Sequence, residues 1–209
     1  MALLITIVIV LAILVGSELY WRKHTMHDEF SRKFVHITVG SFVAFWPYFL
    51  NANQIRLLSV AFLIGVAVSR YGGVFKAIHT VQRPTWGEVW FALVVGLLAF
   101  MAAHPHIYTV ALLEMSLADG LAAVVGTRFG NGNRYTVWGS PKSISGTVAF
   151  ALVSIGLLIG YVLTTPGTLP VAMILPVALG ATVLENVAVH GFDNLFVPLF
   201  VATILRLYS

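Results

Sequence analysis

Long apolar runs, separated by short polar segments, follow one another along nearly the whole chain. The runs are near 20 residues long and do not alternate polar with apolar positions, which is the pattern of membrane-spanning helices rather than of barrel strands. A longer uncharged stretch, 144–184, is divided by proline and glycine at 164–170. We expect about eight passes, at residues 1–20, 34–50, 54–71, 86–103 and 107–128, on either side of 164–170, and at 195–208.

The last run is short and can lie partly in the membrane interface, which would leave seven passes. Composition agrees with a membrane protein, because 59% of the residues are hydrophobic and only 10% are charged, against about a quarter in soluble domains. The absence of cysteine excludes disulfides, thiol nucleophiles and cysteine metal sites. The predicted fold is all-α, a polytopic integral membrane protein with about 7–8 transmembrane helices in a single domain over residues 1–209.

Basic loops alternate with neutral ones along the chain, although the net charge of +4 is modest. The basic loops follow the first, third and fifth runs and contain Arg22, Lys23, Arg32 and Lys33, then Arg70, Lys76 and Arg83, then Arg128, Arg134 and Lys142. The positive-inside rule places these loops in the cytoplasm and, with eight passes, both termini outside. Because no organelle-targeting segment is visible, we expect a prokaryotic inner (cytoplasmic) membrane with a cytoplasmic active face.

Acidic residues gather on the same side as the basic loops. Asp119 lies in the cytoplasmic half of the fifth run and Glu185 lies inside the seventh, where an unpaired charge costs several kcal/mol. Glu88 and Asp193 lie at the cytoplasmic ends of neighbouring runs. Small residues share the helix face of Asp119 and would let another helix or a ligand approach it, at Ala122, Ala123, Gly126 and Gly130.

A glycine-containing basic segment, residues 131–146, leads into the sixth run. The N-terminus of a helix suits phosphate, and Lys142 adds a charge there, while Ser143 and Ser145 add hydroxyl donors. The alternative is an ordinary capped helix start, because the P-loop pattern is absent. The candidate nucleotide-binding residues are Arg32, Lys33, His36, Arg128, Asn131, Asn133, Arg134, Lys142, Ser143, Ser145, Gly146 and Asn194.

The acidic residues supply the other half of a phosphoryl-transfer site. A nucleoside triphosphate is usually bound with Mg²⁺, whose ligands are oxygens, and Asp119, Glu185 and Asp193 are the candidate metal ligands. The candidate catalytic residues are Asp119, Glu88 and Lys142. Which carboxylate acts as base and which binds metal stays open at this point. Arg32 and His36 share a helix face and contact either phosphates or lipid headgroups.

Several short motifs, in this order, resemble the polyprenol kinase family between about residues 30 and 200. They are Arg32-Lys33-Phe34-Val35-His36, Trp86-Gly87-Glu88, Asp119 with Ala122 and Gly126, Lys142-Ser143 with Gly146-Thr147, Glu185-Asn186, and Gly191 with Asp193-Asn194-Leu195 and Pro198. That family includes dolichol, phytol and farnesol kinases and a CTP-dependent diacylglycerol kinase. The resemblance implies transfer of the γ-phosphate of CTP or another NTP to a lipid alcohol in the bilayer.

Two other functions remain as alternatives. The resembled family is related to phosphatidate cytidylyltransferases, but a transferase pattern has Glu where Ser145 stands, and Arg with a second Asp after Asp193. Here Asn194 and Leu195 follow Asp193, which favours the kinase. A small ion-coupled transporter would show inverted repeats and acids spread through the bilayer depth, and the sequence shows neither. The expected partners are a lipid alcohol and a nucleoside triphosphate, with no nucleic acid, and a homodimer is compatible with the sequence.

Overall fold

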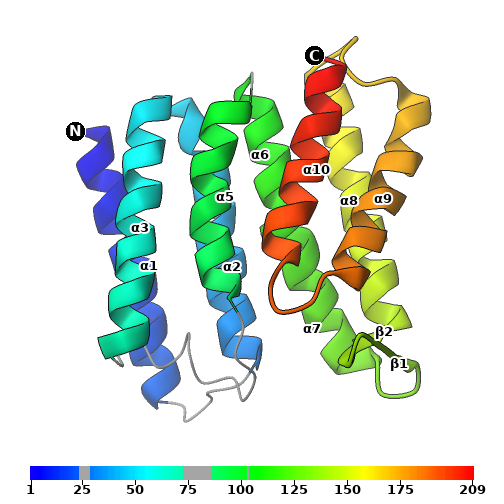
Figure 1. Ribbon diagram of the computed structural model, residues 1–209, viewed down its shortest axis with the longest axis horizontal. Helices are drawn as coiled ribbons and strands as arrows, with labels where there is room; N and C mark the ends of the chain where they lie inside the picture. The colour runs from blue at the N-terminus through cyan, green and yellow to red at the C-terminus, as the bar shows by residue number, and fades with distance from the viewer. Residues whose placement is uncertain (24–28, 73–85, 103) are drawn as a thin grey trace.

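The computed structural model describes residues 1–23, 29–72, 86–102 and 104–209. Helices lie side by side along a common direction in these residues (Figure 1). The first half contains α1 (Ala2–Lys23), α2 (Glu29–Ala44), the short helix η1 (Trp46–Tyr48), α3 (Ala52–Gly72) and α5 (Gly87–Met101). The second half contains α6 (Pro105–Leu113), η2 (Glu114–Ala118), α7 (Asp119–Phe129), α8 (Ile144–Thr164), η3 (Val171–Met173), α9 (Ile174–Val187) and α10 (Asp193–Leu207).

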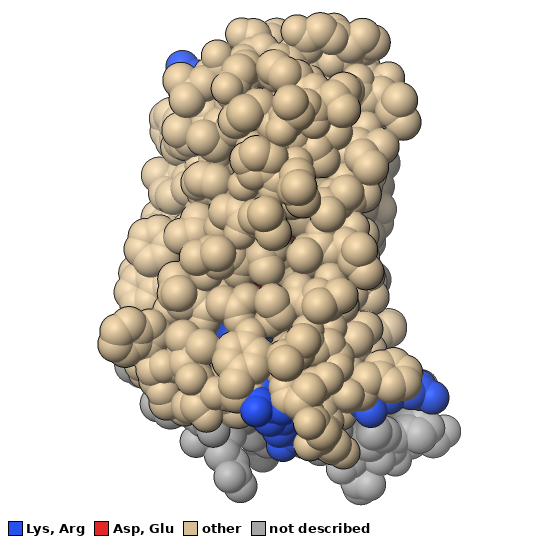
Figure 2. Space-filling view, turned by 90° about the vertical axis from the view of Figure 1, so that its right-hand side faces the viewer, with Lys and Arg blue, Asp and Glu red and all other residues tan. Residues whose placement is uncertain are grey.

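The helices α6, η2 and α7 form one continuous rod, so the described residues make eight helical rods in all. Four stretches are long and apolar enough to cross a membrane, at Ala2–Tyr20, Ala52–Ser69, Pro105–Phe129 and Ile144–Thr164. The side of the bundle shown in Figure 2 is uncharged over most of its height, with Lys and Arg gathered mainly at one end. The chain is therefore an all-α integral membrane protein, as the sequence predicts.

The rod of α6, η2 and α7 is the centre of the fold. In its most apolar 18-residue segment 61% of the residues are buried. The corresponding share is 17% for α1, which lies at the edge of the bundle. Tyr108, Leu112 and Met115 are fully buried there. Midway along the rod, residues Glu114–Ala118 form a wide π-helical turn, a feature that often occurs at functional positions.

A short β-hairpin connects α7 to α8, where the sequence suggests only a loop. Strand β1 (Arg134–Val137) pairs antiparallel with β2 (Ser140–Ser143), in a register that places Arg134 opposite Ser143. Trp138 and Gly139 form its turn with φ values of 48° and 78°. Two consecutive positive φ angles are the geometry of a type I′ turn, whose right-handed twist matches that of the strands.

The two ends of the bundle differ in charge. Both chain termini lie at the end opposite the hairpin (Figure 1). Arg56 and Arg206 donate to carbonyls of Ala99 and Met101 at the carboxyl end of α5. Of the basic residues expected at the hairpin end, Lys76 and Arg83 lie outside the described residues, and nothing is described of the side chains of Arg22, Lys23 and Arg70.

Candidate functional site

An ion pair joins α2 to α7 near the end of the bundle that carries the hairpin. The Lys33 ammonium lies 2.5 Å from Oδ2 of Asp119, and the two side chains are only 10% and 8% exposed. His36, one turn further along α2, has Nε2 3.8 Å from the same oxygen and 3.1 Å from the carbonyl oxygen of Met115. Two buried charges are stable only when they are paired, so this contact fixes both the helices and the position of the Asp119 carboxylate.

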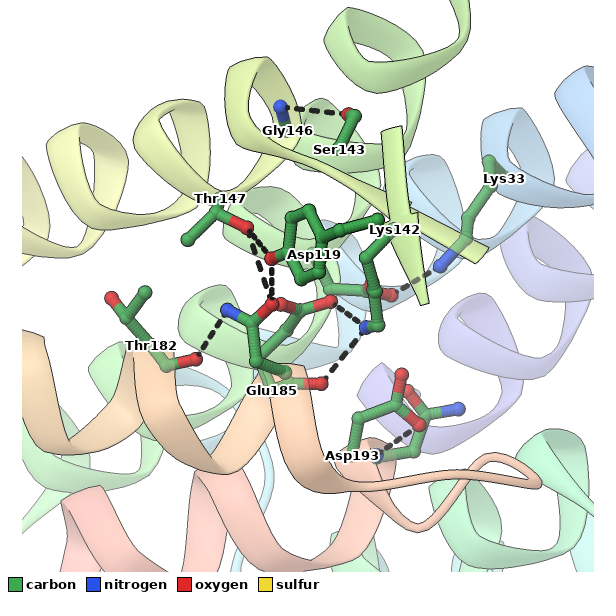
Figure 3. A network of polar contacts seen from close by, with 12 residues as sticks. Lys33, Asp119, Lys142, Ser143, Gly146, Thr147, Thr182, Glu185 and Asp193 are labelled. Carbon is green, nitrogen blue, oxygen red and sulfur yellow. Dashed lines mark hydrogen bonds and ion pairs between the residues drawn. The ribbon is translucent and has the colours of Figure 1, made fainter. Parts of the chain in front are cut away.

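A second ion pair comes from the hairpin. Lys142, on β2, turns inward, donates to the carbonyl oxygen of Glu185 at 2.9 Å, and pairs with the Glu185 carboxylate on α9. Burial alone would lower the pKa of Lys142, but the carboxylates of Glu185, Asp193 and Asp119 raise it above its usual value. Figure 3 shows Lys142 between Asp119 and Glu185, with Asp193 nearby. Lys142 is therefore the cation around which three carboxylates gather.

The start of α10 brings in the third carboxylate. Oδ1 of Asp193 accepts from the backbone N–H of Asn194 at 3.1 Å, and Asp193 makes no ion pair with any described residue. The Asn194 amide nitrogen donates to the carbonyl oxygen of Gly87 at 3.0 Å, which ties α10 to α5. Gly191 has φ 87°, and a Cβ there would lie 2.6 Å from Cα of Gly87, so this close approach requires glycine.

Glu88 follows Gly87 in the first turn of α5. Its Oε2 is buried and accepts no hydrogen bond from a described residue. Because a buried carboxylate oxygen normally has a donor, Glu88 is suited to receive a proton or to contact a ligand. The close packing of Gly87 against Gly191 places it beside the segment that carries Asp193.

The predicted phosphate-binding residues separate into two sets. Ser143 caps α8, since its Oγ accepts from the N–H of Gly146 at 3.1 Å. Asn133 donates to Ser145 Oγ at 2.6 Å, and Ser145 donates to the carbonyl oxygen of Phe129, so these groups attach the hairpin to α7 and α8. Three further members of the predicted set are exposed, Arg128 at the end of α7 and Asn131 and Arg134 in the hairpin segment.

The structure thus brings together the inner residues of the prediction but not the outer ones. Lys33, His36, Asp119, Lys142, Glu185 and Asp193 surround one region, with Asn194 and Glu88 beside it. Arg134 instead bonds to Oδ1 of Asn131 at 2.7 Å at the surface. Arg32 lies near Gly87, with Nη1 4.0 Å from the position of a Cβ on that glycine.

The start of α8 packs against the small residues on the Asp119 face of α7. A Cβ on Gly126 would lie 2.8 Å from Ser143 Oγ and 3.5 Å from Cα of Gly146, and a Cβ on Gly146 would lie 2.9 Å from the carbonyl oxygen of Ala122. The start of α8 therefore packs directly against α7. This contact holds β2, and with it Lys142, beside Asp119.

Two polar features of the site region are not predicted from the sequence. The first is a network in which the Tyr135 hydroxyl bonds to Thr147 at 2.5 Å and to Asn186, while Thr147 donates to Asn186 at 3.2 Å. It joins β1, α8 and α9 next to Glu185, the partner of Lys142, and Figure 3 shows Thr147 on the α8 side of this network. The available sequence signal is that Thr147 and Asn186 both belong to the short motifs, Gly146-Thr147 and Glu185-Asn186. The contact of these two side chains with Tyr135 depends on the hairpin.

The second feature is Glu114, in the π-helical turn one layer deeper than Asp119. Its side chain is fully buried, and Oε1 accepts from Ser154 of α8 at 2.8 Å. Oε2 is buried and has no hydrogen-bond partner among the described residues. An acid inside an apolar run was itself the signal, by the same argument that identifies Asp119.

The carboxylates of the cluster do not form a metal site without further ligands. Within the described part of the chain no three His, Asp or Glu side chains are close enough to hold a metal by themselves. The cluster nevertheless has three carboxylates, from Asp119, Glu185 and Asp193, against the two ammonium groups of Lys33 and Lys142. Mg²⁺ typically takes one or two protein carboxylates and completes its shell with phosphate oxygens and water.

Comparison with known proteins identifies relatives of this chain among the phytol kinases. No protein-family model matches the chain, and no solved structure matches it. The chain is 32% identical to phytol kinase of Synechocystis sp. over 194 residues, which cover 90% of this chain and 83% of that protein. It is 30% identical to probable phytol kinase 1, chloroplastic, of Oryza sativa subsp. japonica and 32% identical to probable phytol kinase, chloroplastic, of Triticum aestivum, covering 66% of each. The chain belongs to the phytol kinase family.

Proposed function

We propose that this chain transfers the γ-phosphate of CTP, or of another nucleoside triphosphate, to the hydroxyl of an isoprenoid alcohol. Family membership supports a lipid alcohol kinase, and the names of the relatives make phytol the first candidate acceptor. The observation that carries the proposal is the buried cluster in which Lys142 and Lys33 pair with Glu185 and Asp119 beside Asp193. Cations for phosphate and carboxylates for metal meet there at one end of a membrane bundle.

In this proposal phosphate oxygens compete with the carboxylates for the two lysines. The ammonium groups of Lys33 and Lys142 then neutralise phosphate, and Asp119, Glu185 and Asp193 would hold Mg²⁺. When bound, Mg²⁺ would neutralise negative charge on the phosphates of the nucleotide. Each of the two ion pairs that opens therefore provides one ammonium group for phosphate and one carboxylate for the cation.

The chemical step needs a base near the lipid hydroxyl. The lipid oxygen bonds to the γ-phosphorus, the bond to the β–γ bridging oxygen breaks, and the nucleoside diphosphate leaves. The hydroxyl proton passes to a carboxylate of the chain, for which Asp119 and Glu88 are the candidates. Glu88 has a buried oxygen with no described donor, whereas Asp119 already accepts from Lys33.

The test uses purified protein in lipid with Mg²⁺, a panel of alcohols plus phosphatidate, and CTP labelled separately at its α- and γ-phosphates. Entry of γ-label into an isoprenoid alcohol supports the kinase and identifies the acceptor. Entry of α-label that requires phosphatidate would establish a cytidylyltransferase instead. Failure of CTP, ATP and UTP to label any lipid would reject the proposal.

We also propose that the hairpin end faces the cytoplasm, where nucleoside triphosphates are found. The basic loops at that end support this orientation. The chain has no cysteine, so single cysteines can be introduced as reporters. In intact cells an impermeant maleimide should label His104→Cys, at the opposite end, and should label Arg134→Cys only after permeabilisation. The reverse pattern would place the site outside.

A further inference from the structure

An apolar cavity of about 220 Å³ lies between α1, α2 and α3. Its walls include Val10 and Leu14 of α1, Val39 and Val43 of α2, and Phe62 and Val66 of α3. Thr6 and Ser69 contribute the hydroxyl groups of the lining, and the Thr6 hydroxyl already donates to the carbonyl oxygen of Ala2 at 2.9 Å. A lining of this kind offers water few partners, so the cavity suits a hydrocarbon.

The cavity lies next to the site. Val39 follows His36 by three residues on α2, which is less than one helical turn. The Phe62 ring in the cavity wall contacts Phe91 edge-on at 5.6 Å, and Phe91 contacts His36 edge-on at 5.4 Å. His36 in turn lies 3.8 Å from Asp119. Two ring contacts, Phe62 to Phe91 and Phe91 to His36, therefore separate the cavity wall from the carboxylate cluster.

The cavity lies at the edge of the bundle. Only 17% of the most apolar 18-residue segment of α1 is buried, so this single helix forms the outer wall of the cavity (Figure 1). The cavity is larger than the roughly 150 Å³ apolar cavities that admit benzene, so it accepts a section of a branched hydrocarbon chain. A Cβ on Gly65, which lines the cavity, would meet nothing within 4 Å.

We propose that this cavity binds part of the isoprenoid chain of the acceptor alcohol. The proposal rests on the proposed function and adds the place where the substrate tail lies. A tail between α1, α2 and α3 extends along the membrane direction, and its hydroxyl end then has to pass the Phe91 and His36 side chains to reach Asp119. The cavity then selects the acceptor by the length and branching of its chain.

Filling the cavity tests this proposal, with a matched control on another helix. Gly65→Phe places a ring in the cavity, whereas Gly160→Phe on α8 places the same ring where a Cβ also meets nothing within 4 Å. Kinase activity is measured with phytol and with the shorter alcohol geraniol. We expect Gly65→Phe to raise KM for phytol about tenfold, or about 1.4 kcal/mol, and to change KM for geraniol about twofold at most. Gly160→Phe should change neither.

A second measurement does not depend on a variant that folds. Wild-type protein is irradiated with an isoprenoid alcohol that carries a diazirine at its far end, and with a fatty acid that carries the same group. We expect the alcohol to label peptides of α1, α2 or α3, and phytol to compete for this labelling. Equal labelling by the fatty acid without competition, or labelling of α8 and α9 instead, would overturn the proposal.

The outcomes separate the two proposals. If no alcohol is phosphorylated, the proposed function fails. If phytol is phosphorylated but Gly65→Phe has the chain-length profile of the wild type, the kinase stands and the tail site is wrong. A uniform loss of activity with both alcohols in Gly65→Phe would likewise reject the tail site.

Discussion

The ammonium nitrogen of Lys33 lies 2.5 Å from a carboxylate oxygen of Asp119, although 86 residues separate them along the chain. This contact closes α2 onto α7 in the interior of the bundle. Both side chains are almost fully buried, so neither charge is stable there without the other. The same pair therefore has two functions that can be separated by mutation, one in folding and one in the proposed chemistry.

Removing the pair as a unit should separate these functions. Asp119→Asn leaves the Lys33 charge buried and unpaired. We therefore expect activity to fall, and the free energy of unfolding to fall by about 3–5 kcal/mol. The double variant Lys33→Met with Asp119→Leu should recover the thermal stability, because an apolar pair often replaces a buried ion pair without loss. It should remain inactive. Activity in the double variant would show that the pair is structural only.

Lys142 should be required for nucleotide use. We expect Lys142→Ala to raise KM for the nucleotide or lower kcat by about 100-fold, since a charged contact to phosphate is lost in a buried site. The matched control is Arg206→Ala at the opposite end of the bundle, where the guanidinium contacts only a backbone carbonyl in the described structure. Steady-state kinetics with varied nucleotide distinguish the two. Equal effects of both substitutions would remove Lys142 from the site.

Close packing of α7 and α8 should depend on Gly146. A Cβ there would lie 2.9 Å from the carbonyl oxygen of Ala122, so Gly146→Ala must push the helices apart. We expect a loss of about 1–3 kcal/mol of stability and a larger KM for nucleotide, because Lys142 moves with α8. Gly156→Ala on the same helix, where a Cβ meets nothing within 4 Å, should be at least as stable as the wild type.

Glu114 should act through hydrogen bonding rather than charge. Glu114→Gln keeps an oxygen that accepts from Ser154, so we expect near-normal thermal stability in detergent. Glu114→Ala removes the acceptor and creates a cavity, and we expect a loss of about 2–4 kcal/mol. Ser154→Ala should cost less than Glu114→Ala. Equal stability of the Gln and Ala variants would show that the hydrogen bond contributes nothing.

Much of this architecture is visible in the sequence. The apolar runs predict the helices, and the one-sided acids predict that Asp119, Glu185 and Asp193 meet at one end. That prediction works because a membrane span has a defined direction, so the depth of a residue follows from its place in the run. Lys142 also lies at this end of the bundle, as its position just before the sixth apolar run suggests. The partners of the two lysines are not predictable, because they depend on which helices are neighbours.

The misses have physical reasons. Strands β1 and β2 have four residues each, too few for a periodic signal, and the turn places Trp138 rather than the usual Asn or Asp at a positive φ. The π-helical turn at Glu114–Ala118 changes the register of the central rod, which a regular helical pattern cannot show. The Ser143 and Ser145 hydroxyls, which the sequence predicts as phosphate donors, also bond to the Gly146 N–H and the Phe129 carbonyl oxygen, and the sequence does not show these contacts.

The excess of carboxylates over lysines has a consequence for the product. The alcohol enters as a neutral molecule, and its phosphate ester leaves with about −1.5 to −2 charges at neutral pH. In the proposed reaction that charge would appear beside the carboxylates of Asp119, Glu185 and Asp193. The neutral hydroxyl end of the alcohol is not repelled by these carboxylates before the reaction. The phosphate ester is repelled after it, once the nucleoside diphosphate and its cation depart. Turnover would then end with the new headgroup driven outward to the water, while its tail stays in the bilayer.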